Sequence, residues 1–382
     1  ASDVYKRQVK DGNKNRLRER DIYKIVTTFN EQISTDPKYA RFVPNEEIKV
    51  KNDYNLNIPR YIDSSEPEDL QDIDAHLHGG IPAADVDSME KYWTLFPNLK
   101  NKLFSPLRDG YYKLNIKKDD VRSTIYSDEE FNAYADRIDM AFDAWKNEVD
   151  DGLRNINESV NIKKYITKLA EALIAQYADM ELVDKYDVYQ VLLSYWQETM
   201  ADDIFILVQD GYEAARETEL IIEVTEDKKT KKEKQKIKGW EGKLIPKSLV
   251  ETAFFAKERA KIDEAQAIVD ETQSRLDEMT EEHTAEDGVL SDCLNDKDAV
   301  DMKAVSAKLN ELKKNAPDSE DYRVLLEYTE LCEKVKKYSK IVKELNTALD
   351  EACKAKYAEL TMDEIKELLV NRKWYYTICS HL

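Results

Sequence analysis

The chain has 382 residues, enough for two or three domains, and combines 42% hydrophobic with 36% charged residues. Acidic residues outnumber basic ones by 78 to 58, and the net charge of −20 argues against tight autonomous DNA binding, because phosphates repel an acidic surface. Only 9 glycines and 9 prolines interrupt the chain, too few for a many-stranded β fold, and no apolar run approaches the roughly 18 residues of a membrane span. The four cysteines lack metal-binding spacing and no secretory signal is present, which predicts reduced thiols and a cytoplasmic location.

The N-terminal region predicts the tail end of an α/β domain, over residues 9–66, after a charged leader, 1–8, that we expect to be non-native. A helix is predicted over 21–30, with Asp21 as its N-cap. Its apolar positions follow helical spacing: Ile22, Ile25, Val26 and Phe29. Residues 39–50 predict a loop and a short strand, broken by Pro44. About fifty residues cannot bury a sizeable core, so the rest of this domain is expected elsewhere.

Residues 52–59 alternate between apolar and polar side chains. Tyr54, Leu56 and Ile58 would point one way, and the intervening asparagines the other. This period of two predicts a short, half-buried strand, which Pro59 confines to an edge or ends.

A helical domain with a small β-hairpin is predicted over 67–246. One helix is expected over 85–95, and a second is expected to start at a capping box formed by Ser127 and Glu130. Two more helices are expected over 165–177 and 186–200. The aromatic and Met stripe of the last helix favours a core face. Strands are predicted over 204–208 and 220–224, and a return strand over 237–240 completes a hairpin.

The connection of this hairpin is rich in lysine. A solvated loop is favoured, and the alternative is a finger that contacts DNA phosphates, since clustered lysines release counterions from a polyanion. The lysines concerned are Lys228, Lys229, Lys231, Lys232, Lys234, Lys236 and Lys238.

Residues 247–358 predict a long antiparallel coiled-coil hairpin, because apolar residues recur every 3.5 residues in two segments. The first seam is Phe255, Ile262, Ala265, Val269, Thr272, Leu276 and Met279, with Glu258 as its charged member. The second is Val324, Tyr328, Leu331, Val335, Tyr338, Val342, Leu345, Leu349 and Ala352. Each arm should be on the order of 50 Å long. The tip spans 286–317, with a short helix over 298–312.

The last region, 359–382, predicts a helix capped by Thr361 with Glu364, running to about Val370, and then a truncated tail. The fold class is therefore mainly α. Two small acidic or histidine pairs, Asp72 with Asp74 and His76 with His78, suggest acid–base or metal chemistry, but capping and surface roles are favoured.

Several segments together resemble the modification subunit of type I restriction-modification systems, a family that methylates adenine N6 in DNA. The segments are 12–18, 52–63, 66–77, 79–82, 186–190 and 195–203, and the resemblance spans about 11–374. Only the C-terminal portion of the family is matched.

The resemblance implies S-adenosylmethionine as cofactor of the full-length protein and an Asn/Asp-Pro-Pro-aromatic loop for the flipped adenine. The chain has no Pro-Pro, so catalytic and cofactor-binding residues are not expected in it, and it should bind no cofactor itself. Asn13, Asn15 and Arg16 follow the catalytic loop in the family and could lie near the active site, although a plain loop before a helix is favoured.

The implied partners are a DNA-specificity subunit, a second modification subunit and a restriction subunit, with double-stranded DNA bound through the complex. The long hairpin would then be an assembly arm. The alternative function is a non-enzymatic helical scaffold that uses the same hairpin for association.

Overall fold

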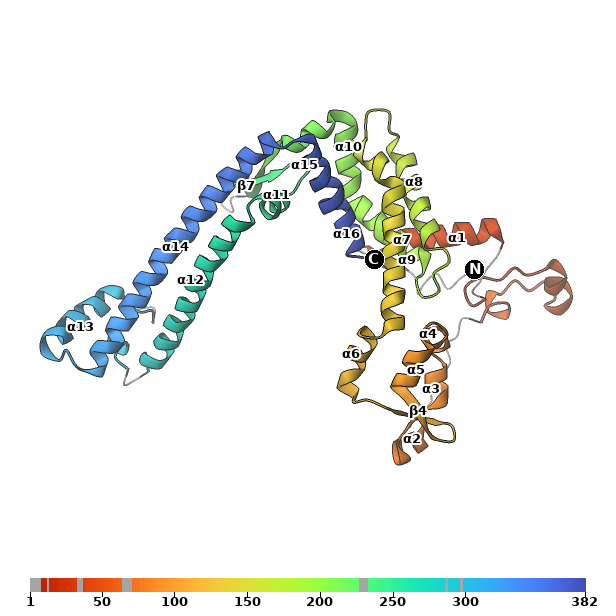
Figure 1. Cartoon of the computed structure of the whole chain (residues 1–382), viewed down its shortest axis with the longest axis horizontal. Helices are drawn as coiled ribbons and strands as arrows, with labels where there is room; N and C mark the ends of the chain where they lie inside the picture. The colour runs from red at the N-terminus through yellow and green to blue at the C-terminus, as the bar shows by residue number, and fades with distance from the viewer. Residues whose placement is uncertain are drawn as a thin grey trace. The chain divides into compact units, whose positions relative to one another are not determined.

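The computed structural model describes residues 8–11, 14–32, 37–63, 71–226, 233–285, 288–295 and 298–382. These residues are mainly helical with small antiparallel sheets (Figure 1), which confirms the mainly α class. The chain divides into two compact units, Ala1–Gly211 with Trp374–Leu382, and Tyr212–Lys373. Among the described residues, every helix is too short or too polar to cross a membrane. The domain limits expected from the sequence stay a prediction.

The first unit begins with a short hairpin, β1 (Gln8–Asp11) and β2 (Lys14–Leu17), followed by helix α1 (Glu19–Glu31). The helix prediction is confirmed, but the cap is wrong. Arg18 holds the N-cap position, and its backbone N–H donates to the carboxylate of Asp21 (3.4 Å). Asp21 therefore satisfies the start of the helix from the third helical position instead of from the cap.

The strand predicted over 52–59 is wrong. Asp53 and Tyr54 have φ of 45° and 59°, which takes the backbone out of the extended region. The Asn57 N–H donates to Asn55 Oδ1 (2.9 Å), a local side-chain turn, and Ile58–Arg60 is a 3₁₀ turn. The apparent alternation thus has no buried face: Leu56 is 71% exposed.

The short strand within 39–50 is also wrong, because Pro44 starts a helical turn instead of breaking a strand. Its carbonyl accepts the N–H groups of Glu47 and Ile48 (3.0 and 3.3 Å), and π-helical backbone follows over Glu47–Lys51. Proline is well suited to the first turn of a helix.

A small module follows in chain order. It contains α2 (Ile73–His78), β3 (Ile81–Pro82), α3 (Ala83–Asp87), α4 (Glu90–Leu95), α5 (Pro97–Leu103), β4 (Phe104–Arg108), β5 (Tyr111–Leu114) and α6 (Val121–Tyr126). Its antiparallel sheet, of order β3-β5-β4, was not predicted. The helix predicted over 85–95 is interrupted at Ser88 and Met89.

Four further helices of the first unit follow in chain order. They are α7 (Glu129–Arg154), α8 (Ile162–Gln176), α9 (Lys185–Tyr195), which continues as π-helix over Trp196–Met200, and α10 (Ala201–Asp210). The helices expected from 127 onward and over 165–177 and 186–200 are confirmed. Their core includes Trp145, Leu153, Leu173, Leu192, Met200 and Ile204. The strand predicted over 204–208 is wrong, since it lies inside α10; a short apolar run does not distinguish a strand from a buried helix.

The cap of α7 is shifted by one residue from the prediction. Asp128, not Ser127, accepts the N–H groups of Glu130 and Phe131 (2.9 and 3.3 Å). The Glu130 carboxylate instead accepts the N–H groups of Asn98 and Leu99 (3.0 and 3.2 Å) at the start of α5. Glu130, which was expected to complete a capping box at the start of its own helix, therefore links α7 to α5.

The second unit begins with the predicted hairpin, β6 (Thr218–Glu226) and β7 (Glu233–Gly242), then α11 (Lys247–Phe254), α12 (Ala256–His283), α13 (Met302–Asn315) and α14 (Glu320–Glu359). Helices α12 and α14 lie side by side in Figure 1 and are antiparallel. Ile262 clusters with Leu349, whereas Arg275, farther along α12, pairs with Glu327, earlier on α14 (3.4 Å). The supercoil expected from the heptads stays a prediction.

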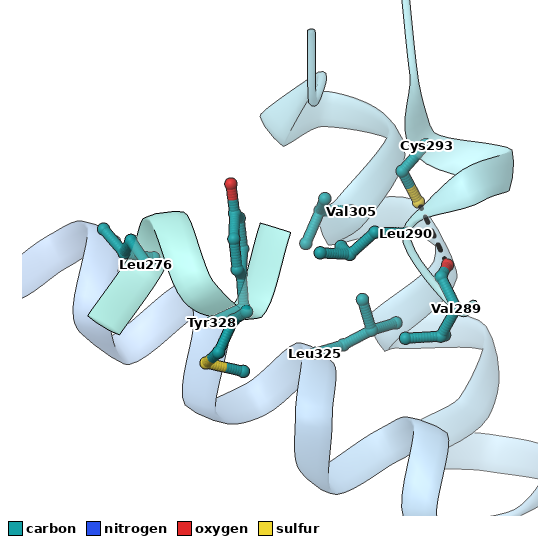
Figure 2. Close-up of a cluster of buried hydrophobic side chains, with 8 residues drawn as sticks. Leu276, Val289, Leu290, Cys293, Val305, Leu325 and Tyr328 are labelled. Atoms are coloured by element: carbon teal, nitrogen blue, oxygen red, sulfur yellow. Dashed lines mark hydrogen bonds between the residues drawn. The ribbon is translucent and has the colours of Figure 1, made fainter. Parts of the chain in front are cut away.

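Helix α12 has 28 residues and α14 has 40, so they are about 42 and 60 Å long. One is shorter and the other longer than the length of about 50 Å predicted for each arm. Residues between the two helices close the far end of the pair with a buried cluster (Figure 2). Its members are Leu276, Met279, Val289, Leu290, Cys293, Val305, Leu325 and Tyr328.

The C-terminal helix starts as predicted, at α15 (Met362–Lys366). Glu364 accepts the N–H of Thr361 (2.8 Å), and the Thr361 hydroxyl accepts that of Glu364 (3.3 Å). The predicted end near Val370 is wrong, because the helix continues through π-helical Glu367–Tyr375 into α16 (Tyr376–Cys379). Trp374 is fully buried, and its indole N–H donates to Asp203 (2.8 Å).

Candidate functional site

Helix α1 has two faces of different character. Tyr23, Lys24 and Thr27 follow one stripe of the helix, and this stripe lies against α9. The aliphatic stripe lies on the other side: Ile22, Ile25, Val26 and Phe29, with exposed fractions of 44%, 39%, 49% and 80%. The more apolar face is therefore the uncovered one among the described residues, which is the reverse of a normal amphipathic helix.

Aromatic and polar contacts hold α1 on α9. The rings of Tyr23 and Tyr189 stack, with centroids 4.6 Å apart and planes inclined by 22°. A hydrogen bond of 3.0 Å joins the hydroxyls of Thr27 and Tyr186. The Arg20 backbone N–H donates to the side chain of Gln190 (3.1 Å). We call this set of contacts the α1–α9 junction.

Charged side chains surround the junction. Arg20 pairs with Asp187, and Lys24 lies 3.5 Å from Asp184. The Lys24 ammonium also lies over the rings of Tyr39 and Tyr186, 4.7 and 5.1 Å from their centroids. Such exposed ion pairs add little stability, so the aromatic contacts dominate the junction.

Burial sets the protonation of the junction tyrosines. It raises the pKa of Tyr23, with a further contribution from the negative charge of Glu171. The pKa of Tyr189 is raised by burial and by the nearby Glu19 carboxylate. Both phenols therefore stay neutral at physiological pH and serve as packing groups.

A cavity of about 570 Å³ lies beside the junction. Lysines 24, 91 and 185 line it together with Glu31, Glu181 and Asp184. Three basic and three acidic side chains give it no overall preference for an anion or a cation. The cavity by itself therefore identifies no ligand.

Of the three residues expected near an active site, Asn13 lies outside the described residues. Asn15 pairs with Lys10 in the β1–β2 register, and Arg16, opposite Val9, is exposed. Neither residue is among those that line the cavity beside the junction, and their proximity to an active site stays a prediction.

The lysine-rich segment is described only in part. Lys228, Lys229, Lys231 and Lys232 lie outside the described residues, and Lys234 is placed opposite Thr225 in the β6–β7 ladder. Lys236 is exposed, and Lys238 forms an ion pair of 3.0 Å with Glu223. Phosphate contact by these lysines stays a prediction.

The acidic and histidine pairs lie along α2 and at its N-cap. Asp72 caps the helix by accepting the Ala75 N–H (2.9 Å) and also accepts the Tyr111 hydroxyl (2.8 Å). These hydrogen bonds lower the pKa of Asp72. Arg108 and His78 lower the pKa of Asp74 in the same way. His76 and His78 both lie on this helix, and the described residues contain no cluster of three potential metal ligands.

Part of the chain is similar to a known protein family. Residues 2–70 match the family model of the N-6 DNA methylases. The match supports an adenine-N6 DNA methyltransferase family. No curated protein matches the chain, and no solved structure does. The methylase-matching segment contains the β1–β2 hairpin and α1, so the α1–α9 junction is where this segment is anchored on the helical part of the first unit.

Methylases of this kind typically use S-adenosylmethionine. To approach this cofactor closely, the protein backbone needs a glycine-rich turn after a strand. The adjacent Gly79 and Gly80 do not fit this role. A Cβ at Gly80 would lie 3.1 Å from Leu107 and 3.2 Å from Tyr111, so this glycine permits close packing against the small sheet. The Gly79 carbonyl accepts a hydrogen bond from Arg108 (3.1 Å). The residues present therefore do not form a cofactor site at these glycines.

The sequence did not reveal the junction. It predicted α1 from its aliphatic stripe and thus pointed to the uncovered face. The available signal was the second stripe, in which Tyr23 and Thr27 lie one turn apart and match the tyrosines of α9.

Proposed function

We propose that this chain is the C-terminal part of the modification subunit of a type I restriction-modification system. The full subunit transfers a methyl group from S-adenosylmethionine to adenine N6 in DNA. This part mainly supplies subunit assembly and binds no cofactor itself. The partners are a DNA-specificity subunit, a second modification subunit and a restriction subunit, and double-stranded DNA is bound through the complex in the cytoplasm.

The observation that carries the proposal is the uncovered face of α1 within the methylase-matching segment. Phe29 is 80% exposed, and an exposed apolar stripe of this kind favours a protein partner. The partner we propose is the catalytic core of the methylase. In this arrangement α1 is held by α9 through its aromatic stripe and by the catalytic core through its aliphatic stripe.

The test is methyl transfer by the enlarged protein. The chain is expressed with the coding sequence directly upstream of residue 1 and with the neighbouring specificity gene, and transfer of labelled methyl groups to DNA adenine is measured. We expect methylation. The upstream reading frame should encode a glycine-rich turn and an Asn-Pro-Pro-aromatic loop.

Phe29→Asp should lower the rate about tenfold or more, because a charge on the apolar stripe prevents docking of the catalytic core. Met140→Asp is the matched control: Met140 is 70% exposed on α7, outside the methylase-matching segment. Absence of methylation contradicts the proposal, and so does an equal loss of rate in the two variants.

The second candidate is a non-enzymatic helical scaffold. The long α12–α14 pair favours it, because two extended antiparallel helices offer a surface for helical partners. An upstream region without either methylase motif, together with stable complexes that never methylate DNA, would establish this alternative.

A further inference from the structure

The β6–β7 ribbon is free-standing over much of its length and carries exposed aliphatic side chains. These are Leu220, Ile221, Ile222, Val224 and Ile237, which are 48–63% exposed. The sheet has only two strands, and isolated two-stranded sheets are marginally stable in water. An aliphatic surface of this kind indicates a protein partner.

The two edges of the ribbon differ. On β7 the register shifts between Ile221 and Ile222 of the opposite strand, so that Lys238 is an extra, bulged residue. Lys236 is exposed on the same strand. Bulges and lysines are the usual protection of a sheet edge against pairing. The described part of β6 carries neither, so its edge is the one open to another strand.

We propose that β6 pairs with β6 of a second copy of this chain, antiparallel and centred on Ile222. A two-fold axis at this position places Ile222 opposite its symmetry mate. It also places Leu220 opposite Val224, and Ile221 opposite Glu223. Aliphatic pairs then line one face of a four-stranded sheet of order β7-β6-β6-β7. Cross-strand aliphatic pairs are the unit of stabilisation in such a sheet.

Charge selects this register over its neighbours. If the axis lay at Ile221, Glu219 would face Glu223 of the other copy. If it lay at Glu223, that residue would face itself. Like charges directly opposite one another destabilise a strand pair. The register centred on Ile222 avoids both clashes and also gives the longest overlap of the two strands.

The inference does not rest on the methyltransferase proposal, because every residue that carries it lies on the ribbon of the second unit. It is measured by association of the chain with itself, whereas the proposed function is measured by methylation. Failure of one therefore leaves the other standing.

The sharpest test is disulfide trapping in the full chain, with the exposed Cys379 replaced by serine. Ile222→Cys should give a covalent dimer on mild oxidation, because directly opposed residues lie within disulfide range. Val224→Cys is the matched control of similar exposure. Its two copies would be offset by four residues, about 13 Å along the strands, so no cross-link is expected.

Sedimentation equilibrium gives the second test. Ile222→Lys should weaken the dimer about tenfold or more, because it places two like charges face to face. Ile221→Lys should leave the dimer as tight or tighter, because each new lysine would face Glu223 of the other copy. If the substitutions acted only by removing aliphatic surface, the dimer would be weakened equally in both variants.

Any of four results overturns the inference. They are a wild-type chain that stays monomeric at its highest soluble concentration, no cross-link through Ile222→Cys, equal cross-linking through Val224→Cys, or equal weakening by the two lysine variants. A monomer whose ribbon binds DNA instead would likewise overturn it.

Discussion

Replacing Tyr23 by alanine should release α1 from α9. Tyr23 stacks on Tyr189 at 4.6 Å, and aromatic pairs contribute about 0.5–1.5 kcal/mol beyond the area they bury. Truncating a fully buried aromatic residue costs about 3–5 kcal/mol, and Tyr23 is only partly buried, so a cost somewhat below that range applies. The junction should therefore lose about 2–3 kcal/mol, which corresponds to about a 30- to 150-fold rise in the open population of α1.

Native-state hydrogen exchange measures this opening directly. The amides of α1 should lose protection by about the same factor, while those of α7 and α8 should keep theirs. Ile25→Ala is the matched control, because Ile25 lies on the opposite, exposed face of the same helix (39% exposed). A surface change of this kind should stay within about 0.5 kcal/mol.

Two results would refute the reasoning about the junction. One is unchanged protection of α1 in Tyr23→Ala. The other is an equal loss of protection in Ile25→Ala, which would mean that the aliphatic stripe, not the aromatic one, holds the helix in the isolated chain.

Three further changes test the packing of the chain. Leu325→Ala, in the fully buried cluster at the end of the α12–α14 pair, should cost about 2–5 kcal/mol in urea unfolding followed by circular dichroism. Gly242→Ala should destabilise the base of the ribbon by about 1–3 kcal/mol in the same measurement, because the new Cβ would lie 2.1 Å from the Ile245 carbonyl oxygen. The pKa of Asp128 would be raised by burial alone, but hydrogen bonds from Lys102 and the start of α7 lower it below its ordinary 3.8. Its contribution to stability is thus present above about pH 4 and is lost as the pH falls through the lowered value, so Asp128→Asn should flatten thermal stability against pH in that acidic range.

The long helices were predictable because their apolar residues repeat with one helical period over many positions. The apolar residues of α12 and α14 repeat over several heptads, and the capping box of Thr361 is a local signal that the structure reproduces. Short segments failed for the opposite reason. In residues 52–59 three apolar positions suggested a strand, but the positive φ of Tyr54 and the turn after it decide the backbone. In 204–208 five apolar residues fit a strand and a buried helix equally well, and neighbouring helices decide the outcome.

The candidate site was harder to predict than the fold. Helical periodicity identifies which face of α1 is apolar, but it does not say whether another part of the chain covers that face. Phe29 was rightly placed on the aliphatic stripe, and only the structure places that stripe away from α9. The hydrogen bond between Thr27 and Tyr186 joins residues 159 positions apart, and no local pattern contains that information.

The acidic composition of the chain and its exposed apolar surfaces point to the same kind of interaction. A net charge of −20 opposes direct contact with phosphates, whereas the aliphatic stripe of α1 and the edge of β6 suit protein partners. Salt distinguishes the two cases. Binding through phosphates weakens steeply as the salt concentration rises, because the release of counterions from DNA then contributes less free energy to binding. Association through apolar side chains and strand pairing is screened far less. If the chain acts by assembly, its self-association should persist from about 50 to 500 mM salt, while any DNA binding through Lys236 and its neighbours should be lost over the same range.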